Sequence, residues 1–499
     1  MPEPRRLIVT IIVSLIAAGA CSSTVSPPAS TSPAPSTGSA SIAPVQSDLP
    51  SPSPATPEAS VAPTSAPPAT SHILVRGSAR ELSSNPVLMV PTRDGHLFVE
   101  VPSRASGSTV LTRFDSEGRS APGWPVTLAG ATYCAAPMPV GDGSVRMLCT
   151  LQNTTGGQDS GRAFAFDDTG RTLPGWPVEI DDPVVAGRLI GNSLRVLANV
   201  ATDTEDEESR AEWFLLSIDA AGATTTGVVM PRSASCCPMV AIGPDGAAYS
   251  VTPGFAPEKR SQITAFDMDG VLPRFPTAVV GLASGVSFDS DGNIWVLSAF
   301  PANRTSRVLM VFDTGSVPLP FAAADPSSGD TGGCESTIPL SPLMPSDRNG
   351  HIVEYSDVDE TVFAVDRHLS TAKGWPFTLP DPLVHPRPGP ESEHEAGYCP
   401  GPLAPAVGPD GTVYLALQAH RSSVGGSLVA VGPDGRVRAG WPVGLKRAGA
   451  EFWSIAVGPD ETVYAIAYEP AAGGTSTATV LAIAPDSTIL YRTTIIAPA

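Results

Sequence analysis

The chain has 499 residues, of which 54 are Pro, 47 are Gly and only 16% are charged. This turn-rich composition excludes a helical bundle or a coiled coil. The formal charge is −19, from 49 acidic and 30 basic residues, and this argues against a nucleic-acid partner because phosphate binding needs clustered Lys and Arg. With 42% hydrophobic but only 6% aromatic residues, the core must be filled largely by small apolar side chains.

The first twenty residues have the pattern of an export signal. Arg5 and Arg6 precede an apolar run over 7–18, and small residues then lead to Cys21. A charged start, a short apolar segment and a small-residue cleavage site are typical of a secretory signal, and the run is too short for a comfortable membrane span. One interpretation of this pattern is an ordinary secreted protein in which Cys21 is incidental.

Cys21 directly after the small residues resembles the lipobox of bacterial lipoproteins, although Ala18 stands where Leu is more usual. The resemblance implies that 1–20 are removed and that a lipid on the Cys21 thiol anchors the protein to the membrane on its extracytoplasmic side. Of the 49 residues over 22–70, 40 are Ser, Thr, Pro or Ala, with no aromatic residue and no Lys or Arg. Such a segment has almost nothing to bury, so we expect 21–71 to be a disordered, partly extended stalk.

From residue 72 to 499 a unit of about fifty residues recurs. It consists of an apolar strand, a Pro-Asp-Gly-like turn, further strands and a Gly-Trp-Pro element. That element contains Trp124, Trp176, Trp375 and Trp441, and a degenerate copy contains Phe275. The spacings of 52, 99 and 100 residues from Trp124 to Trp375 indicate one period followed by two double periods.

The first turn of each unit supports the same phase. These turns pair Asp or Asn with Gly in most copies, which suits tight strand reversals, and they begin at Arg93, Gly141, Gly191, Pro244, Ser290, Arg348, Pro409 and Pro459. Small sheets repeated at this period predict an all-β fold, a single β-propeller of antiparallel strands with eight blades, or with seven as the alternative. We expect Trp124, Trp176, Phe275, Trp375 and Trp441 to pack between blades; the alternative is a ring of aromatic ligand platforms.

The repeat also resembles the quinoprotein-like (PQQ-like) propellers over about residues 73–496. Its marks are the V-G-P-D-G-x-V-Y turn and strand, and the D-x-x-G-x-x-x-x-G-W-P run, which is complete from Asp115 and from Asp167 and shorter from Asp434. That group includes lipoproteins of the outer-membrane-assembly type and true quinoprotein dehydrogenases. The resemblance therefore implies either a binding module or an oxidoreductase that uses PQQ and Ca²⁺.

Six cysteines follow Cys21, and an even number in an exported domain suggests disulfides. Cys134 and Cys149 flank the Asp142-Gly143 turn, so a bond across this hairpin is geometrically reasonable. Cys334 with Cys399 would join two blades, and Cys236 with Cys237 would form a vicinal pair. Quinoprotein dehydrogenases stack their cofactor on such a pair, but the calcium ligands and the carboxylate base cannot be assigned in this chain. We expect no cofactor, and a structural turn or free thiols at Cys236 and Cys237.

The longest departure from the repeat lies near Pro380–Tyr398. It contains His385, Glu391, Glu393, His394 and Glu395 among prolines. Imidazole and carboxylate groups can ligate zinc, but no two histidines have ligand spacing, so an exposed partner-contact loop is the favoured interpretation.

No catalytic motif is recognised in the sequence, neither a Gly-x-Ser-x-Gly elbow nor a phosphate-binding loop nor His-Glu-x-x-His. The sequence therefore predicts a monomeric, membrane-anchored, extracytoplasmic propeller that binds or scaffolds a protein or cell-envelope ligand. The alternatives are a PQQ- or metal-dependent oxidoreductase of the same fold and a propeller hydrolase or lyase.

Overall fold

Among the residues that the computed structural model describes, every regular element is a β-strand. The described residues are 70–74, 88–103, 107–151, 159–200, 212–231, 239–252, 261–279, 282–289, 291–300, 303–312, 352–356, 361–365, 370–378, 405–417, 425–470 and 476–496. The chain separates into two units, Met1–Ser65 and Ala66–Ala499, and all described residues belong to the second. A helix of membrane-spanning length and hydropathy does not occur in this part of the chain.

The strands form eight sheets, each built from consecutive segments of the chain. Blade 1 contains β2 (Leu88–Pro91), β3 (Leu97–Ser103), β4 (Ser108–Phe114) and β5 (Val126–Ala129), and blade 2 contains β6 (Ala131–Cys134), β7 (Met138–Pro139), β8 (Val145–Leu151), β9 (Ser160–Phe166) and β10 (Val178–Ile180). Blade 3 contains β11 (Val184–Ile190), β12 (Ser193–Val200), β13 (Glu212–Ile218) and β14 (Thr224–Pro231), and blade 4 contains β15 (Met239–Ile242), β16 (Ala248–Thr252), β17 (Ser261–Phe266) and β18 (Thr277–Val279).

Blades 5 to 8 continue in the same order. Blade 5 contains β19 (Leu282–Phe288), β20 (Ile294–Phe300) and β21 (Asn303–Phe312), and blade 6 contains β22 (Ile352–Ser356), β23 (Thr361–Val365) and β24 (Phe377–Thr378). Blade 7 contains β25 (Ala406–Val407), β26 (Val413–Leu417), β27 (Ser427–Val431) and β28 (Val443–Gly444). Blade 8 contains β29 (Glu451–Val457), β30 (Val463–Pro470), β31 (Ser476–Ile483) and β32 (Ile489–Ile496), to which β1 (Thr70–Leu74) is added.

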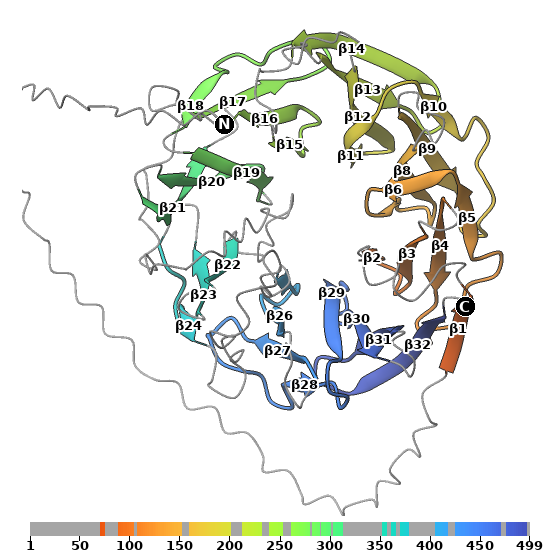
Figure 1. The fold of residues 1–499 in the computed structure, drawn as a ribbon, viewed down its shortest axis with the longest axis vertical. Coiled ribbons are helices and arrows are strands. Elements are labelled where there is room, and N and C mark those ends of the chain that lie inside the picture. Colours follow the sequence, from red (N-terminus) through yellow and green to blue (C-terminus); the bar gives the residue numbers. More distant parts are fainter. Residues whose placement is uncertain are drawn as a thin grey trace, which may run out of the picture. The chain divides into compact units, whose positions relative to one another are not determined.

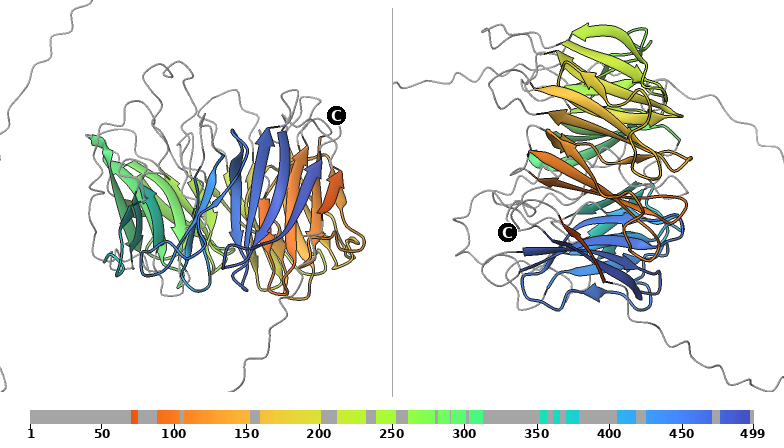
Figure 2. Two further views of the ribbon diagram at one scale, coloured as in Figure 1. Left: turned by 90° about the horizontal axis from the view of Figure 1, so that it is seen from below. Right: turned by 90° about the vertical axis from the view of Figure 1, so that its right-hand side faces the viewer.

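Apart from β1, the strands of a blade pair antiparallel in chain order, with β6 and β7 of blade 2 both pairing with β8, so the first strand lies innermost and the last outermost (Figure 1). The eight sheets surround a central axis, and Figure 2 shows them from the side with neighbouring blades face to face. The first turns close tightly because glycine at the turn accepts a positive φ, as at Gly246 (84°) and Gly411 (84°). The predicted all-β propeller is confirmed, with eight sheets.

The hydrophobic core lies between the blades and not within any one of them. Among the described residues, seven clusters of buried side chains each join two neighbouring blades, covering every seam except that between blades 5 and 6. A small sheet has two apolar faces, and stacking the blades covers both of them.

The seam between blades 8 and 1 closes the ring. Tyr491 of β32 packs on Gly118 so closely that a Cβ at this glycine would lie 2.4 Å from the ring, and the Thr493 hydroxyl donates to the Gly118 carbonyl at 2.9 Å. Strand β1 pairs in parallel with β32, with Thr70 opposite Arg492 and Leu74 opposite Ile496. The first strand thus begins at Thr70, two residues before the start expected from the repeat, and adds a fifth strand to the last blade.

Candidate functional site

Two ends of the ring differ in how far the structure describes them. In an antiparallel blade the turn between the first and second strands and the turn between the third and fourth strands lie at the same end, which we call the turn face. Most of these turns are described, whereas the connections at the opposite end fall largely outside the described residues. The turn face is therefore the end of the ring that the structure describes more fully.

Four of the five predicted packing aromatics donate a hydrogen bond across a seam. The indole Nε1 donates to a backbone carbonyl in the outer turn of the next blade, with the pairs being Trp124 to Asp168 (3.1 Å), Trp176 to Ala220 (3.3 Å), Trp375 to Pro433 (3.3 Å) and Trp441 to Pro485 (3.0 Å). These indoles are only 7–9% exposed, so their faces are covered by protein and do not form open ligand platforms.

The glycine before each tryptophan brings two backbones together. Gly123 has a φ of 84°, and a Cβ there would lie 1.9 Å from the Thr169 carbonyl oxygen; Gly175 has the same relation to Ala221, also at 1.9 Å. Only glycine fits such a contact. Gly-Trp-Pro is thus a clasp between blades, and its peptide bond from Trp to Pro is cis, as is the bond from Phe275 to Pro276.

Phe275 occupies the clasp position between blades 4 and 5 and has no side-chain N–H to donate across the seam. Its ring meets Tyr249 edge-on, with centroids 5.9 Å apart, and it packs on the cluster shared by the two blades. The position is therefore filled by apolar contact alone.

A second seam position recurs four residues after the Asp of the first turn in blades 1, 2, 4, 5, 7 and 8. In blade 4, Tyr249 lies opposite the small Ala241, faces blade 5 and donates its hydroxyl to Asp245 at 2.7 Å. Burial, followed by this bond to Asp245, raises the pKa of Tyr249. The same position holds Phe98, Arg146, Trp295, Tyr414 and Tyr464 in blades 1, 2, 5, 7 and 8.

Arg146 shows how a cation is accommodated at this position. It is 3% exposed, its guanidinium donates to the Ser144 hydroxyl at 3.0 Å and lies 5.3 Å from the centroid of the Trp176 ring. Asp142 in the turn accepts from the Ser144 hydroxyl at 2.6 Å and supplies the balancing charge. Blade 2 therefore pairs its seam arginine with an aromatic face and a carboxylate.

Blade 3 differs at the same place. Its first turn is Gly191-Asn192 and carries no carboxylate, the large position is Arg195, and the residue opposite it is Arg188 where other blades have Ala or another uncharged residue. Both arginines are partly buried and face blade 4. Two like charges directly opposite each other on one face of a sheet are unfavourable.

The surroundings of this pair only partly balance it. One Arg188 nitrogen donates to the Ile242 carbonyl of blade 4 at 3.1 Å. Burial lowers the pKa of Arg188, and nearby Asp245 only partly opposes that effect. Both Asp245 oxygens already accept hydrogen bonds within blade 4, from the Ala247 N–H at 3.1 Å and from the Tyr249 hydroxyl at 2.7 Å. Arg188 and Arg195 therefore form the candidate site.

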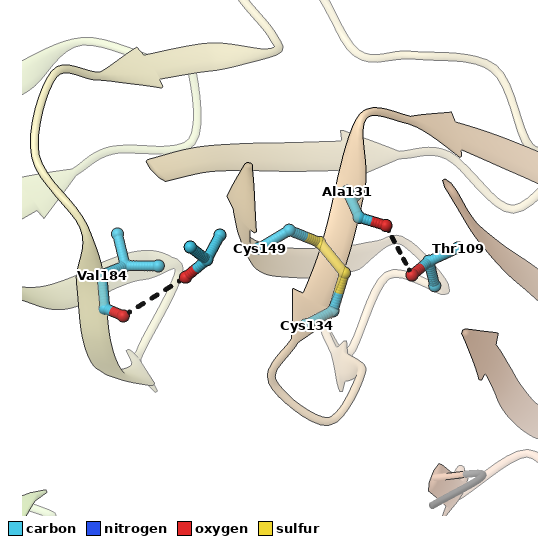
Figure 3. Close-up of a disulfide and its surroundings, with 6 residues drawn as sticks. Thr109, Ala131, Cys134, Cys149 and Val184 are labelled. Atoms are coloured by element: carbon cyan, nitrogen blue, oxygen red, sulfur yellow. Dashed lines mark hydrogen bonds between the residues drawn. A yellow bond between two sulfur atoms is a disulfide. The ribbon is translucent and has the colours of Figure 1, made fainter. Parts of the chain in front are cut away.

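The predicted hairpin disulfide joins Cys134 and Cys149, which lie opposite each other in the pairing of β6 with β8 (Figure 3). Blade 2 is hydrogen-bonded to both neighbours close to it. The Thr109 hydroxyl of blade 1 donates to the Ala131 carbonyl at 3.0 Å, and the Thr150 hydroxyl donates to the Val184 carbonyl of blade 3 at 3.5 Å. The disulfide therefore fixes the inner corner of blade 2 between two seams.

Glu100 is an isolated buried acid in blade 1. It is 2% exposed, and its Oε2 has no hydrogen-bond partner among the described residues. Burial raises its pKa well above the ordinary value for a carboxyl group. It lies on β3 on the same face as Phe98, toward blade 2 and not at the candidate site.

Within the part of the chain that the structure describes, no group of three or more His, Cys, Asp or Glu side chains is placed to hold a metal ion. Asp289 accepts from the N–H groups of Asp291 and Asn293, the Asn293 amide and the Trp295 indole. The remaining predicted residues lie outside the described residues: Cys21, Cys236, Cys237, Cys334, Cys399, His385, Glu391, Glu393, His394 and Glu395.

Comparison with known proteins identifies no family: no protein-family model and no curated protein matches the chain. Among solved structures, the chain is similar to an acylaminoacyl peptidase from Pyrococcus horikoshii (11% identity, TM-score 0.42, 83% of this chain and 54% of that chain). It is also similar to the β-propeller domain of the Trilobed protease from Pyrococcus furiosus (9%, TM-score 0.38, 79% and 93%) and to a eukaryotic initiation factor (10%, TM-score 0.42, 82% and 88%).

The chain spans about half the length of the acylaminoacyl peptidase that it matches. Identities of 9–11% bring no activity, substrate or partner to this chain. The fold assignment rests on the eight sheets and their seams. The chain is a β-propeller in which seven described seams are packed by apolar side chains and four of them also carry a hydrogen-bonded tryptophan clasp.

Proposed function

We propose that the protein is a membrane-anchored, extracytoplasmic β-propeller that serves as a binding or scaffolding module. The observation that carries the proposal is the order of parts: a lipobox-like Cys21, a stalk rich in Ser, Thr, Pro and Ala, and a propeller that the chain joins at the outer strand β1. Strand β1 lies at the outer edge of the last blade, so the chain enters the propeller at its rim.

The engaged side chains at the seams support a scaffold role. Trp124, Trp176, Trp375 and Trp441 are used to hold blades together, and Arg146 and Tyr249 are paired within their seams. Rigid rings of this kind present loops and turns to a partner without rearranging. The partner is a protein or a cell-envelope ligand, and the propeller acts as a monomer.

Metabolic labelling with an alkyne analogue of palmitate tests the anchor. We expect the wild-type chain, produced in a bacterium that processes lipoproteins, to incorporate the label and to partition into the detergent phase of Triton X-114. A Cys21→Ala variant, which keeps the propeller intact, should lose both properties. An unlabelled wild-type chain that stays in the aqueous phase would remove the membrane half of the proposal.

The adjacent pair Cys236 and Cys237 favours a second candidate, an oxidoreductase of the quinoprotein-like group. The resemblance in the V-G-P-D-G-x-V-Y and G-W-P motifs supports it. Adding PQQ and Ca²⁺ to the purified chain should then raise its melting temperature and change the absorption spectrum of PQQ. The lack of both effects would discard this candidate and leave the binding module.

A further inference from the structure

We propose that Arg188 and Arg195 form an anion site on the turn face, at the seam between blades 3 and 4, that binds the phosphate or carboxylate group of a small ligand. The proposal goes beyond the anchoring and scaffolding role, and either can fail without the other. Its starting point is the departure of blade 3 from the seam pattern of the other described blades.

The charge at this seam is unbalanced. Arg188 and Arg195 are register partners in the pairing of β11 with β12, and neither forms an ion pair with a carboxylate of the described residues. Asp245 contributes one negative charge nearby, but its oxygens accept from blade 4 itself. Partly buried like charges repel strongly unless a counter-ion lies between them.

The hydrogen-bond donors are also in excess. Each guanidinium has five N–H groups and no acceptor, and within the described part of the chain Arg188 has one protein acceptor, the Ile242 carbonyl at 3.1 Å. The Arg195 Nε is buried without a hydrogen-bond partner among the described residues. This bond to Ile242 fixes Arg188 in place, and the remaining donors suit the forked geometry of an oxyanion.

The other seam arginines show that the arrangement in blade 3 is specific to that blade. Arg113 donates to Asp94 and to the Asp168 carbonyl, at 3.0 and 3.1 Å. Arg438 donates to Asp410 at 2.7 Å. Arg113 and Arg438 thus each bond a carboxylate of the chain, which neither Arg188 nor Arg195 does among the described residues.

The site is reachable because Gly191 and Asn192 in the turn are exposed and both arginines are only partly buried. The adjoining turn of blade 4 places Gly246 beside Arg195: a Cβ built at this glycine would lie 3.5 Å from the Arg195 Nε. Because the Arg195 Nε is itself buried against this turn, the terminal guanidinium nitrogens of Arg195 are the donors left to an incoming anion. A single oxyanion group fits the number of donors, whereas a polyanion is disfavoured by the net charge of −19.

Thermal melting and calorimetric titration of the full chain in detergent, at constant pH and ionic strength, test the proposal. The probes are sodium phosphate and sodium succinate, with sodium chloride as the reference. We expect one or both oxyanions to raise the melting temperature above the chloride value. Stabilisation by phosphate alone assigns a tetrahedral oxyanion, and stabilisation by succinate alone assigns a carboxylate.

Variants locate the effect. Arg195→Gln should raise the dissociation constant of the oxyanion at least about tenfold, because a hydrogen bond to a charged group contributes about 1.5–3 kcal/mol. The double variant Arg188→Ala, Arg195→Tyr installs the pair found in blade 4, so it should fold and lose the oxyanion effect. Arg436→Gln removes an exposed arginine from the turn of blade 7 and should bind as the wild type does.

Three outcomes would overturn the proposal. The first is that neither oxyanion stabilises the wild type beyond chloride. The second is that the folded double variant keeps the full effect. The third is that Arg436→Gln weakens binding as much as Arg195→Gln, which would indicate general screening of charge.

Discussion

Replacing Trp441 tests the clasp between blades 7 and 8. Its Nε1 donates to the Pro485 carbonyl at 3.0 Å, its ring meets Tyr414 edge-on at 5.5 Å, and it is 7% exposed. Trp441→Phe removes the hydrogen bond and part of the ring, at a cost of about 2 kcal/mol. Trp441→Ala also removes the packing and the aromatic pair, at a cost of about 4–5 kcal/mol.

These free energies convert to modest shifts in melting temperature because the propeller is large. About 430 residues at roughly 2.1 cal/mol/K each give an unfolding entropy of about 0.9 kcal/mol/K. We therefore expect the midpoint to fall by about 2 °C in Trp441→Phe and by about 5 °C in Trp441→Ala. Circular dichroism at several heating rates measures both values and shows whether unfolding is reversible.

The control is Trp453→Phe. Trp453 lies on the inner strand β29 against Tyr468, with ring centroids 5.2 Å apart, and belongs to no clasp. We expect a shift of about 1 °C or less there. If Trp441→Ala melted with the wild type, or if Trp441→Phe lost as much as Trp441→Ala, the clasp would not hold the seam in the way described.

Three further perturbations have defined outcomes. Gly123→Ala should lower the free energy of unfolding by more than about 3 kcal/mol, since its Cβ would lie 1.9 Å from a backbone oxygen. The control Gly95→Ala, whose Cβ would have nothing within 4 Å, should lower it by about 1 kcal/mol. Equal melting temperatures of the two variants would contradict this reasoning. Replacing Cys134 and Cys149 by Ala opens a loop of 15 residues and should lower stability by about 3 kcal/mol; no change in the denaturation midpoint would refute that role. Because burial raises the pKa of Glu100, the folded state holds this proton more tightly than the unfolded state does. The contribution of Glu100 to the free energy of unfolding therefore falls as the pH rises above about 4.3, by up to about 1.4 kcal/mol per pH unit. The melting temperature of Glu100→Gln should equal that of the wild type at pH 4.5 and should exceed it by a growing margin as the pH rises toward 8. A difference between the two melting temperatures that does not depend on pH would count against the buried acid.

The repeat, its phase and its closure into a propeller could be predicted because they depend on local patterns. Turns such as Pro244-Asp245-Gly246 and strands such as Val413–Leu417 have a recognisable sequence, and the Gly-Trp-Pro spacing counts the units. The hairpin disulfide was predictable for the same reason, because Cys134 and Cys149 flank one turn.

Strand β1 and the arginine pair could not be predicted in this way. The segment Thr70–Leu74 has no distinctive pattern, and its partner β32 lies more than four hundred residues away in the chain. The sequence identifies Gly191-Asn192 as a turn but does not show the charged pair beside it. The strand register of the structure is needed, because it aligns Arg195 with Tyr249, Tyr414 and Tyr464. The same register aligns Arg188 with the small residues that lie opposite these tyrosines. The acceptors of the clasp tryptophans are backbone carbonyls, which leave no mark in the sequence.

A crystal structure of the chain tests the central claim most directly. The account predicts eight sheets around one axis, with the ring of Tyr491 on Gly118 and the Thr493 hydroxyl bonded to the Gly118 carbonyl, so that the last blade meets the first. An open stack of sheets, or electron density in which β32 and the Gly118 turn lie apart, would contradict the closed propeller and every role derived from its seams.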